Sequence, residues 1–188
     1  RLVKEKGIDV FEEVVKTLRE RGHKVRPLIV GAGPAGDDLA GRIGDAVFTG
    51  HVEGEELARA VGSADILVNP STTEAFGNVN LEAMASGLAV VSADAPAARA
   101  LIEDGKNGLI VPPRDARAYA DAIERLTDDP AYRKTLADAG IAFSERYHWS
   151  AILDNVIASY RQAIAEGPHL RDPKVAAVAA KRRAAFAA

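Results

Sequence analysis

The sequence of 188 residues predicts an α/β domain built on a doubly wound parallel sheet. Short runs that are apolar at every position alternate along the chain with segments whose apolar residues recur at helical spacing. Fully apolar strands are typical of a parallel sheet that helices cover on both faces, and the alternation is typical of β-α-β crossovers. The carboxyl ends of such strands carry the ligand sites, so the loops after the strands are where we expect function.

The elements follow from local patterns. In the first helix, at 8–21, Asp9 and Glu12 are expected to form a capping box and Gly22 to end the helix. Asp129 and Pro130 begin a later helix, and Trp149 with Ser150 is expected to act as staple and N-cap of the last one. Helices are also expected at 55–62, 78–86 and 96–102, and strands at 25–30, 46–49, 66–68, 89–92 and 109–111.

Residues 1–166 are predicted to form one domain and residues 167–188 an Ala-rich, basic, helical tail. Residues 1–3 have the pattern of the end of a strand whose beginning lies before them. The tail has two readings: a helix that bridges domains or faces a membrane, where each Lys or Arg near anionic lipid contributes about 1 kcal/mol, or a solvated, frayed helix.

Composition excludes several classes of protein. The absence of cysteine excludes thiol catalysis, iron–sulfur clusters, cysteine-type zinc sites and a disulfide scaffold. A net charge of -3 gives no reason to expect binding to nucleic acid. No apolar run approaches the roughly 20 residues that span a bilayer. The four histidines show no metal-ligand spacing, so we expect no metal site.

A G-x-G-x-x-G pattern, Gly31 to Gly36, follows the first predicted strand. A dinucleotide site needs those glycines beside a helix N-terminus and an acid about 20 residues later, where Glu53 stands. However, two acids follow directly, and Gly41 and Gly44 are expected to interrupt a helix there. The pattern therefore favours a tight structural turn over an NAD site.

The segment 70–87, PSTTEAFGNVNLEAMASG, carries the stronger signal. Gly77 lets a ligand approach the backbone, and free N–H groups of Asn78, Val79 and Asn80 at a helix start would bind an anion. Glu74 and Glu82 are then either hydrogen-bond acceptors for sugar hydroxyls or, alternatively, a loop acid and a solvated helix residue. The residue types alone leave these two alternatives level.

This segment holds an E-x7-E pattern and resembles the corresponding motif of family 4 retaining glycosyltransferases. The matching motifs also include RLVKEKG at 1–7, VGAGP at 30–34 and DGKNGL at 104–109, in the same order. The resemblance runs from Arg1 to about Ile164 and is to the carboxyl-terminal domain, a Rossmann-like half of a GT-B fold. It departs at Ala89, where the family usually has Pro, and at residues 96–100, where it often has Gly-Gly and a Glu.

The resemblance implies roles for individual residues. Arg1 and Lys6 match the basic pair that neutralises the diphosphate leaving group. Glu74 matches the acid that holds the hydroxyls of the donor sugar, and Glu82 the acid that binds the ribose. Backbone and glycine positions would line the donor: Phe76, Gly77, Asn78, Val79, Gly31 and Gly33, with His51 to Glu53 near the base.

The implied function is transfer of a hexose from a UDP-, GDP- or ADP-sugar to an acceptor, with retention of configuration and without a cofactor or metal. The family binds its acceptor on an N-terminal domain that precedes Arg1, so the chain alone is expected to be nearly inactive. The expected location is the cytoplasm, with peripheral contact at the inner membrane face as one option. Two alternatives remain: a nucleotide-binding module without catalysis, and an NAD-dependent dehydrogenase.

Overall fold

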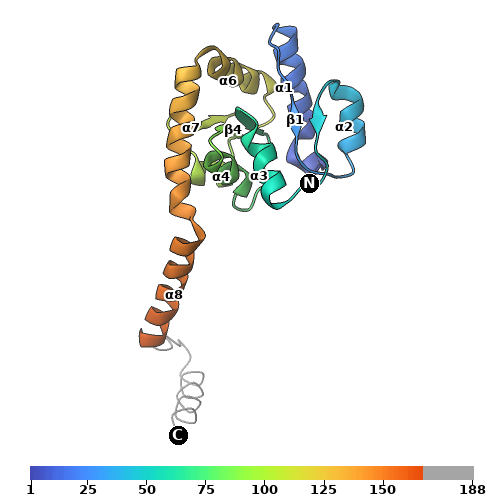
Figure 1. The fold of residues 1–188 in the computed structure, drawn as a ribbon. Coiled ribbons are helices and arrows are strands. Elements are labelled where there is room, and N and C mark those ends of the chain that lie inside the picture. Colours follow the sequence, from blue (N-terminus) through green and yellow to red (C-terminus); the bar gives the residue numbers. More distant parts are fainter. Residues whose placement is uncertain (167–188) are drawn as a thin grey trace. The chain divides into compact units, whose positions relative to one another are not determined.

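The computed structural model describes residues 1–166 and confirms the α/β class (Figure 1). The helices are η1 (Lys4–Lys6), α1 (Ile8–Glu20), α2 (Gly36–Ile43), α3 (Gly54–Gly62), α4 (Asn78–Ala85), α5 (Pro96–Leu101), α6 (Ala116–Asp128), α7 (Pro130–Ser144), η2 (Glu145–Tyr147) and α8 (Trp149–Glu166). The strands are β1 (Leu28–Ile29), β2 (Val47–Phe48), β3 (Ile66–Asn69), β4 (Ala89–Ala93) and β5 (Leu109–Val111). The described chain divides into two compact units, Arg1–Glu145 and a second unit that begins at Arg146. The predicted tail, 167–188, lies outside the described residues.

All strand pairs are parallel, as predicted, but the strands lie in two sheets rather than one. β1 pairs with β2, and β3, β4 and β5 form a second sheet in that order. The predicted strand at 25–30 shrinks to two residues, since Pro27 has no N–H to donate and Gly31 leaves the ladder to bridge Gly50. Residues 1–3 are not a strand, because the Leu2 backbone bonds to Ala32 and Ala35 of the loop after β1 instead.

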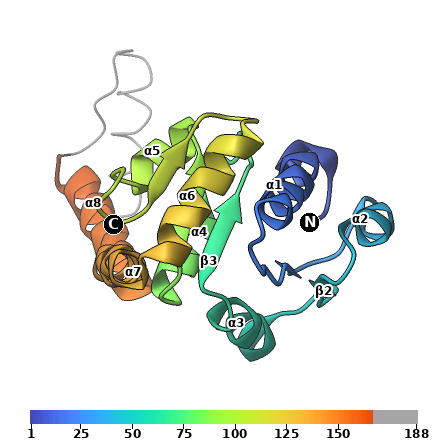
Figure 2. The same cartoon turned by 90° about the horizontal axis from the view of Figure 1, so that it is seen from above.

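β4 is buried at all five positions and separates two layers of helix. Ala89, Val91 and Ala93 pack in the core formed with α1 and α6, whereas Ser92 points toward α4. Successive side chains of a strand point to opposite faces, so α6 and α4 cover opposite faces of this sheet. Figure 2 shows α1 between α6 and α2. Residues of α1 belong to two hydrophobic clusters, one that includes residues of α6 and one that includes residues of α2.

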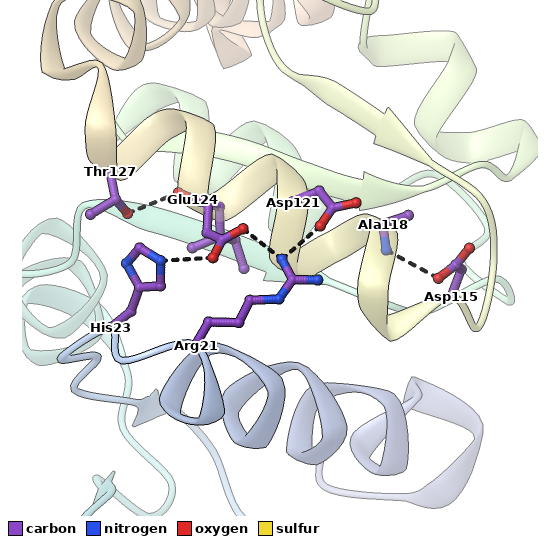
Figure 3. A network of polar contacts seen from close by, with 8 residues as sticks. Arg21, His23, Asp115, Ala118, Asp121, Glu124 and Thr127 are labelled. Carbon is purple, nitrogen blue, oxygen red and sulfur yellow. Dashed lines mark hydrogen bonds and ion pairs between the residues drawn. The ribbon is translucent and has the colours of Figure 1, made fainter.

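A polar network also ties α1 to α6 (Figure 3). Arg21 donates to Asp121 and Glu124 at 2.6 and 2.5 Å, and His23 Nε2 lies 2.7 Å from Glu124. The hydrogen bonds that Arg21 donates to Asp121 and Glu124 raise its pKa, so the guanidinium stays charged. The network holds the C-terminal end of α1 against α6, and with it the start of α1 near the sheet.

Three local predictions are wrong. The N-cap of α1 is Gly7, in a left-handed conformation and with no side-chain cap, because Asp9 and Glu12 are engaged by Arg114 and Arg42 instead of the backbone. α2 continues through Gly41, since burial of Leu39 and Ile43 compensates for a glycine that costs about 1 kcal/mol.

The third concerns the start of α8, which begins at Trp149, so Ser150 is not the N-cap. Its hydroxyl lies 2.9 Å from Nδ1 of His148. The predicted start of α7 is confirmed, because the Asp129 carboxylate accepts from the Tyr132 N–H at 2.9 Å with Pro130 as the first helical residue. Within residues 1–166 no helix is both long and apolar enough to cross a membrane.

Candidate functional site

The loop that follows β3 lies beside η1 because Gly7 permits a close approach. A Cβ on Gly7 would lie 2.9 Å from both Cβ and O of Pro70, and the left-handed φ of 73° also favours glycine. Gly7 is therefore the point at which residues 4–7 and 70–74 can touch. This contact joins two segments that the family resemblance assigns to the same site.

The contact brings Lys6 onto Glu74. Nζ of Lys6 donates to Oε1 of Glu74 at 2.5 Å, and 37% and 22% of the two side chains are exposed. Burial raises the pKa of Glu74, but the hydrogen bond and the positive charge of Lys6, together with the nearby Ser71 hydroxyl, outweigh burial, so the pKa lies below its ordinary value. Glu74 is thus a carboxylate at neutral pH.

Beneath this loop lies a network of buried polar side chains. Asn69 Nδ2 donates to Asn80 Oδ1 at 2.9 Å, and Asn80 Nδ2 lies 3.5 Å from Ser92 Oγ. The Tyr119 hydroxyl donates to the Asn69 carbonyl at 3.0 Å, and Asn69 Oδ1 accepts from the Ser71 N–H at 3.2 Å. The network fixes the end of β3, the first turn of α4 and the loop between them.

Sequence analysis missed the roles of Asn69, Ser92 and Tyr119. One signal could have revealed the first two: each is a polar residue in an otherwise apolar strand, where a buried polar group needs a partner. Tyr119 carried no such signal, because its ring also fits the apolar stripe of α6.

Among the described residues, no side chain caps the N-terminus of α4. Gly77 precedes it with φ 91°, and none of the described residues accepts from the N–H groups of Asn78 or Val79. The prediction that Asn80 also offers a free N–H is wrong, because that group donates to the Gly77 carbonyl at 2.9 Å. Two backbone donors and the positive end of a helix dipole therefore remain for an anion.

Ser71 is 3% exposed, and in the described part of the chain its Oγ has no partner within hydrogen-bond distance. The hydroxyl nevertheless lies close enough to Glu74 to lower the pKa of that carboxyl, together with Lys6, against the effect of burial. A buried hydroxyl without a hydrogen-bond partner lowers the free energy of unfolding by about 1–3 kcal/mol.

The glycine-rich loop packs on residues 1 and 2. A Cβ on Gly33 would lie 2.3 Å from the Leu2 carbonyl oxygen, and one on Gly31 would lie 3.9 Å from the Arg1 nitrogen. Gly31 N donates to Gly50 O at 2.9 Å. The space that a side chain at Gly33 would fill is thus occupied by protein backbone, which supports the structural reading of this pattern.

The remaining predicted residues lie at the surface. Phe76 is 47% exposed, and Glu82 is exposed on α4, where its spacing of four from Asn78 puts both on one helix face. His51 Nε2 lies 2.9 Å from Glu53. In the departing loop after β4, Arg99 forms a two-point contact with Asp94, which lowers the pKa of Asp94.

No cluster of three or more potential metal ligands occurs within the described residues. The groups gathered at this edge are instead one ammonium, one carboxylate, free backbone donors and several hydroxyls and amides. Such a set binds a phosphate and a polyol by hydrogen bonds and charge.

Comparison with known proteins identifies the family of the chain. The family model described as "Glycosyl transferases group 1" matches residues 1–129. Alpha-D-kanosaminyltransferase of Streptomyces kanamyceticus is 35% identical over 169 residues, which is 86% of this chain and 44% of that protein. Phosphatidyl-myo-inositol mannosyltransferase of Mycobacterium tuberculosis is 36% identical over 171 residues, 86% and 45% respectively.

Two solved structures are similar. The C-terminal domain of a group 1 glycosyl transferase, LpcC, from Francisella tularensis has a TM-score of 0.67 at 29% identity, with 79% of this chain and 83% of that chain covered. The pneumococcal O-GlcNAc transferase GtfA, solved with UDP and GlcNAc, has a TM-score of 0.77 at 25% identity, covering 87% and 34%. The chain spans less than half the length of the two curated relatives. It belongs to the group 1 glycosyltransferases and corresponds to the C-terminal domain of their GT-B fold.

Proposed function

We propose that the chain binds a nucleotide-diphosphate sugar and supplies the donor half of a retaining, metal-independent hexosyltransferase. The observation that carries this proposal is that Lys6 and Glu74 lie in contact at the carboxyl edge of β3, beside the loop that leads to the open N-terminus of α4. A cation and free N–H groups suit a diphosphate, while a carboxylate suits sugar hydroxyls.

Each group has a distinct task in the proposed reaction. Lys6, Arg1 and the N–H groups of Asn78 and Val79 would stabilise the charge that develops on the departing diphosphate. Glu74 would accept hydrogen bonds from the donor sugar, and Glu82, on the same face of α4 as Asn78, would bind the ribose. These assignments follow the family motif residue by residue.

The acceptor would bind on a second domain. Relatives of this chain are about twice as long, and GtfA was solved with UDP and GlcNAc. The two named relatives are a kanosaminyltransferase and a phosphatidyl-myo-inositol mannosyltransferase, so their names do not agree on one sugar. The sugar and the acceptor of this chain therefore stay open, and the acceptor could be a small molecule, a lipid or a polysaccharide. We propose that the 188-residue chain binds donor but transfers sugar far more slowly than a two-domain relative.

A binding panel tests the proposal. Isothermal titration and thermal melts with UDP, GDP, ADP, their sugar derivatives and NADH should reveal binding of one nucleoside diphosphate, unaffected by EDTA. A ligand at 100 times its Kd adds about 2.7 kcal/mol and is easily seen in a melt. Stabilisation by NADH alone would instead support a dehydrogenase.

Variants connect the binding to the site. K6M should weaken nucleotide binding by about ten- to a hundredfold, the effect of losing a charged hydrogen bond worth about 1.5–3 kcal/mol. K106M is a matched control, since Lys106 forms an exposed ion pair with Glu103. This pair precedes the amino end of β5, whereas the candidate site lies at the carboxyl ends of the strands. Equal effects of K6M and K106M would reject the site.

A further inference from the structure

Lys6 and Glu74 satisfy each other in the free protein, yet the proposed function needs them apart. Lys6 must reach the diphosphate and Glu74 must reach the sugar, but the two charges lie 2.5 Å from one another and Glu74 is mostly buried. A ligand that takes Lys6 therefore leaves a carboxylate without its cation in a poorly hydrated place. Such an unpaired charge is costly.

We infer that Glu74 competes with the diphosphate for Lys6, so that the site selects the intact sugar nucleotide over the nucleoside diphosphate. This inference rests on the proposed function and goes beyond it, because it assigns donor-over-product selectivity to one ion pair. The geometry supplies the argument in two steps.

The first step compares the two ligands. A sugar nucleotide that takes Lys6 brings hydroxyl donors to Glu74, so the carboxylate exchanges one set of hydrogen bonds for another. A nucleoside diphosphate takes Lys6 and brings nothing to Glu74. The cost of breaking the pair is thus offset only by the ligand that carries a sugar.

The second step concerns turnover. Transfer leaves the nucleoside diphosphate behind, and the return of Glu74 to Lys6 would displace it. The ion pair then favours product release and binding of the next donor. Lys6 has a partner both in the free protein, where it pairs with Glu74, and in the complex, where it pairs with the diphosphate. The relative affinity for donor and product therefore depends on whether the ligand also provides a partner for Glu74.

The test measures the Kd of UDP and UDP-glucose by titration calorimetry in the full chain, or of GDP and GDP-mannose where the panel selects guanine. E74Q keeps the shape of the side chain and removes its charge, and we expect it to bind UDP about tenfold more tightly while losing the preference for UDP-glucose. E103Q is the matched control, since it makes the same change in the exposed Lys106 pair. In a K6M background, E74Q should leave UDP binding unchanged.

Unchanged or weaker binding of UDP by E74Q, with wild-type binding intact, overturns the inference and leaves the proposed function standing. Absence of nucleotide binding by the wild-type chain overturns the proposed function itself. Tighter UDP binding by E74Q in both the wild-type and K6M backgrounds would show that Glu74 merely repels phosphate, which also rejects competition for Lys6.

Discussion

Asn69 donates a 2.9 Å hydrogen bond from Nδ2 to Oδ1 of Asn80, and this bond joins the end of β3 to the first turn of α4. Both side chains are buried, at 7% and 1% exposure. The loop between them carries Glu74, so its position depends on a contact that the protein core protects from water. The bond is therefore part of the site, although neither side chain faces a ligand.

We expect N80A to destabilise the chain by about 1–3 kcal/mol, because it leaves Asn69 Nδ2 buried without an acceptor. The free energy of unfolding in urea measures this loss. N78A is the control, since Asn78 is exposed on the same helix and surface substitutions usually stay within about 0.5 kcal/mol. Equal losses in the two variants would mean that the network adds nothing beyond helix propensity.

Tyr119 predicts a dependence of stability on alkaline pH. Burial raises the pKa of Tyr119, whose hydroxyl donates to the Asn69 carbonyl. In the unfolded chain the phenol ionises near pH 10, so the contribution of Tyr119 is complete below about pH 10 and is lost as pH rises above it. Y119F should lower stability by about 1 kcal/mol at pH 7 and flatten the alkaline loss. Parallel curves for wild type and Y119F above pH 10 would contradict the assignment.

Periodicity predicted the elements well because most of them bury one continuous stripe. α5, β4 and β5 lie where the sequence patterns place them. The family resemblance implies one site for Lys6 and Glu74, and the structure brings the two side chains into contact. The direct ion pair between them was not predictable, since it depends on the backbone contact of Gly7 with Pro70 across more than sixty residues. Local patterns hold no information on such an approach.

Two of the wrong predictions share a physical cause. Asp9 and Glu12 have the spacing of a capping box, but arginines from distant segments compete for them. Gly41 has low helix propensity, but two buried side chains on the same helix outweigh it. In each case a tertiary contact overrides a local preference. The buried amides below the loop escaped notice for the same reason, because their partners come from other elements.

Arg114 has a positive φ of 59°, the only such value for a non-glycine residue in the described chain. The left-handed conformation costs a residue with a Cβ about 1–2 kcal/mol, whereas glycine adopts it freely. We expect R114G to be more stable than R114A by about 1 kcal/mol in urea unfolding, since both variants lose the exposed contact with Asp9 and only one relieves the backbone. Equal stability would show that this turn relaxes when the arginine is removed.

Gly7 provides the last prediction, which separates strain from close approach. G7A places a Cβ at 2.9 Å from Pro70 and forces a left-handed φ on alanine, so it should lower both stability and nucleotide affinity. Gly22 has a similar positive φ of 90° but no atom within 4 Å of the added Cβ, so G22A pays only the conformational cost, about 1–2 kcal/mol.

Urea unfolding and UDP titration on both variants therefore divide the two effects. G7A should lose more stability than G22A, and only G7A should weaken UDP binding. The reason is that Gly7 contacts Pro70, which begins the loop that holds Glu74 against Lys6, whereas Gly22 has no such contact. If G7A bound UDP like the wild type, the approach of η1 to this loop would be structural alone. The ion pair would then form without help from Gly7.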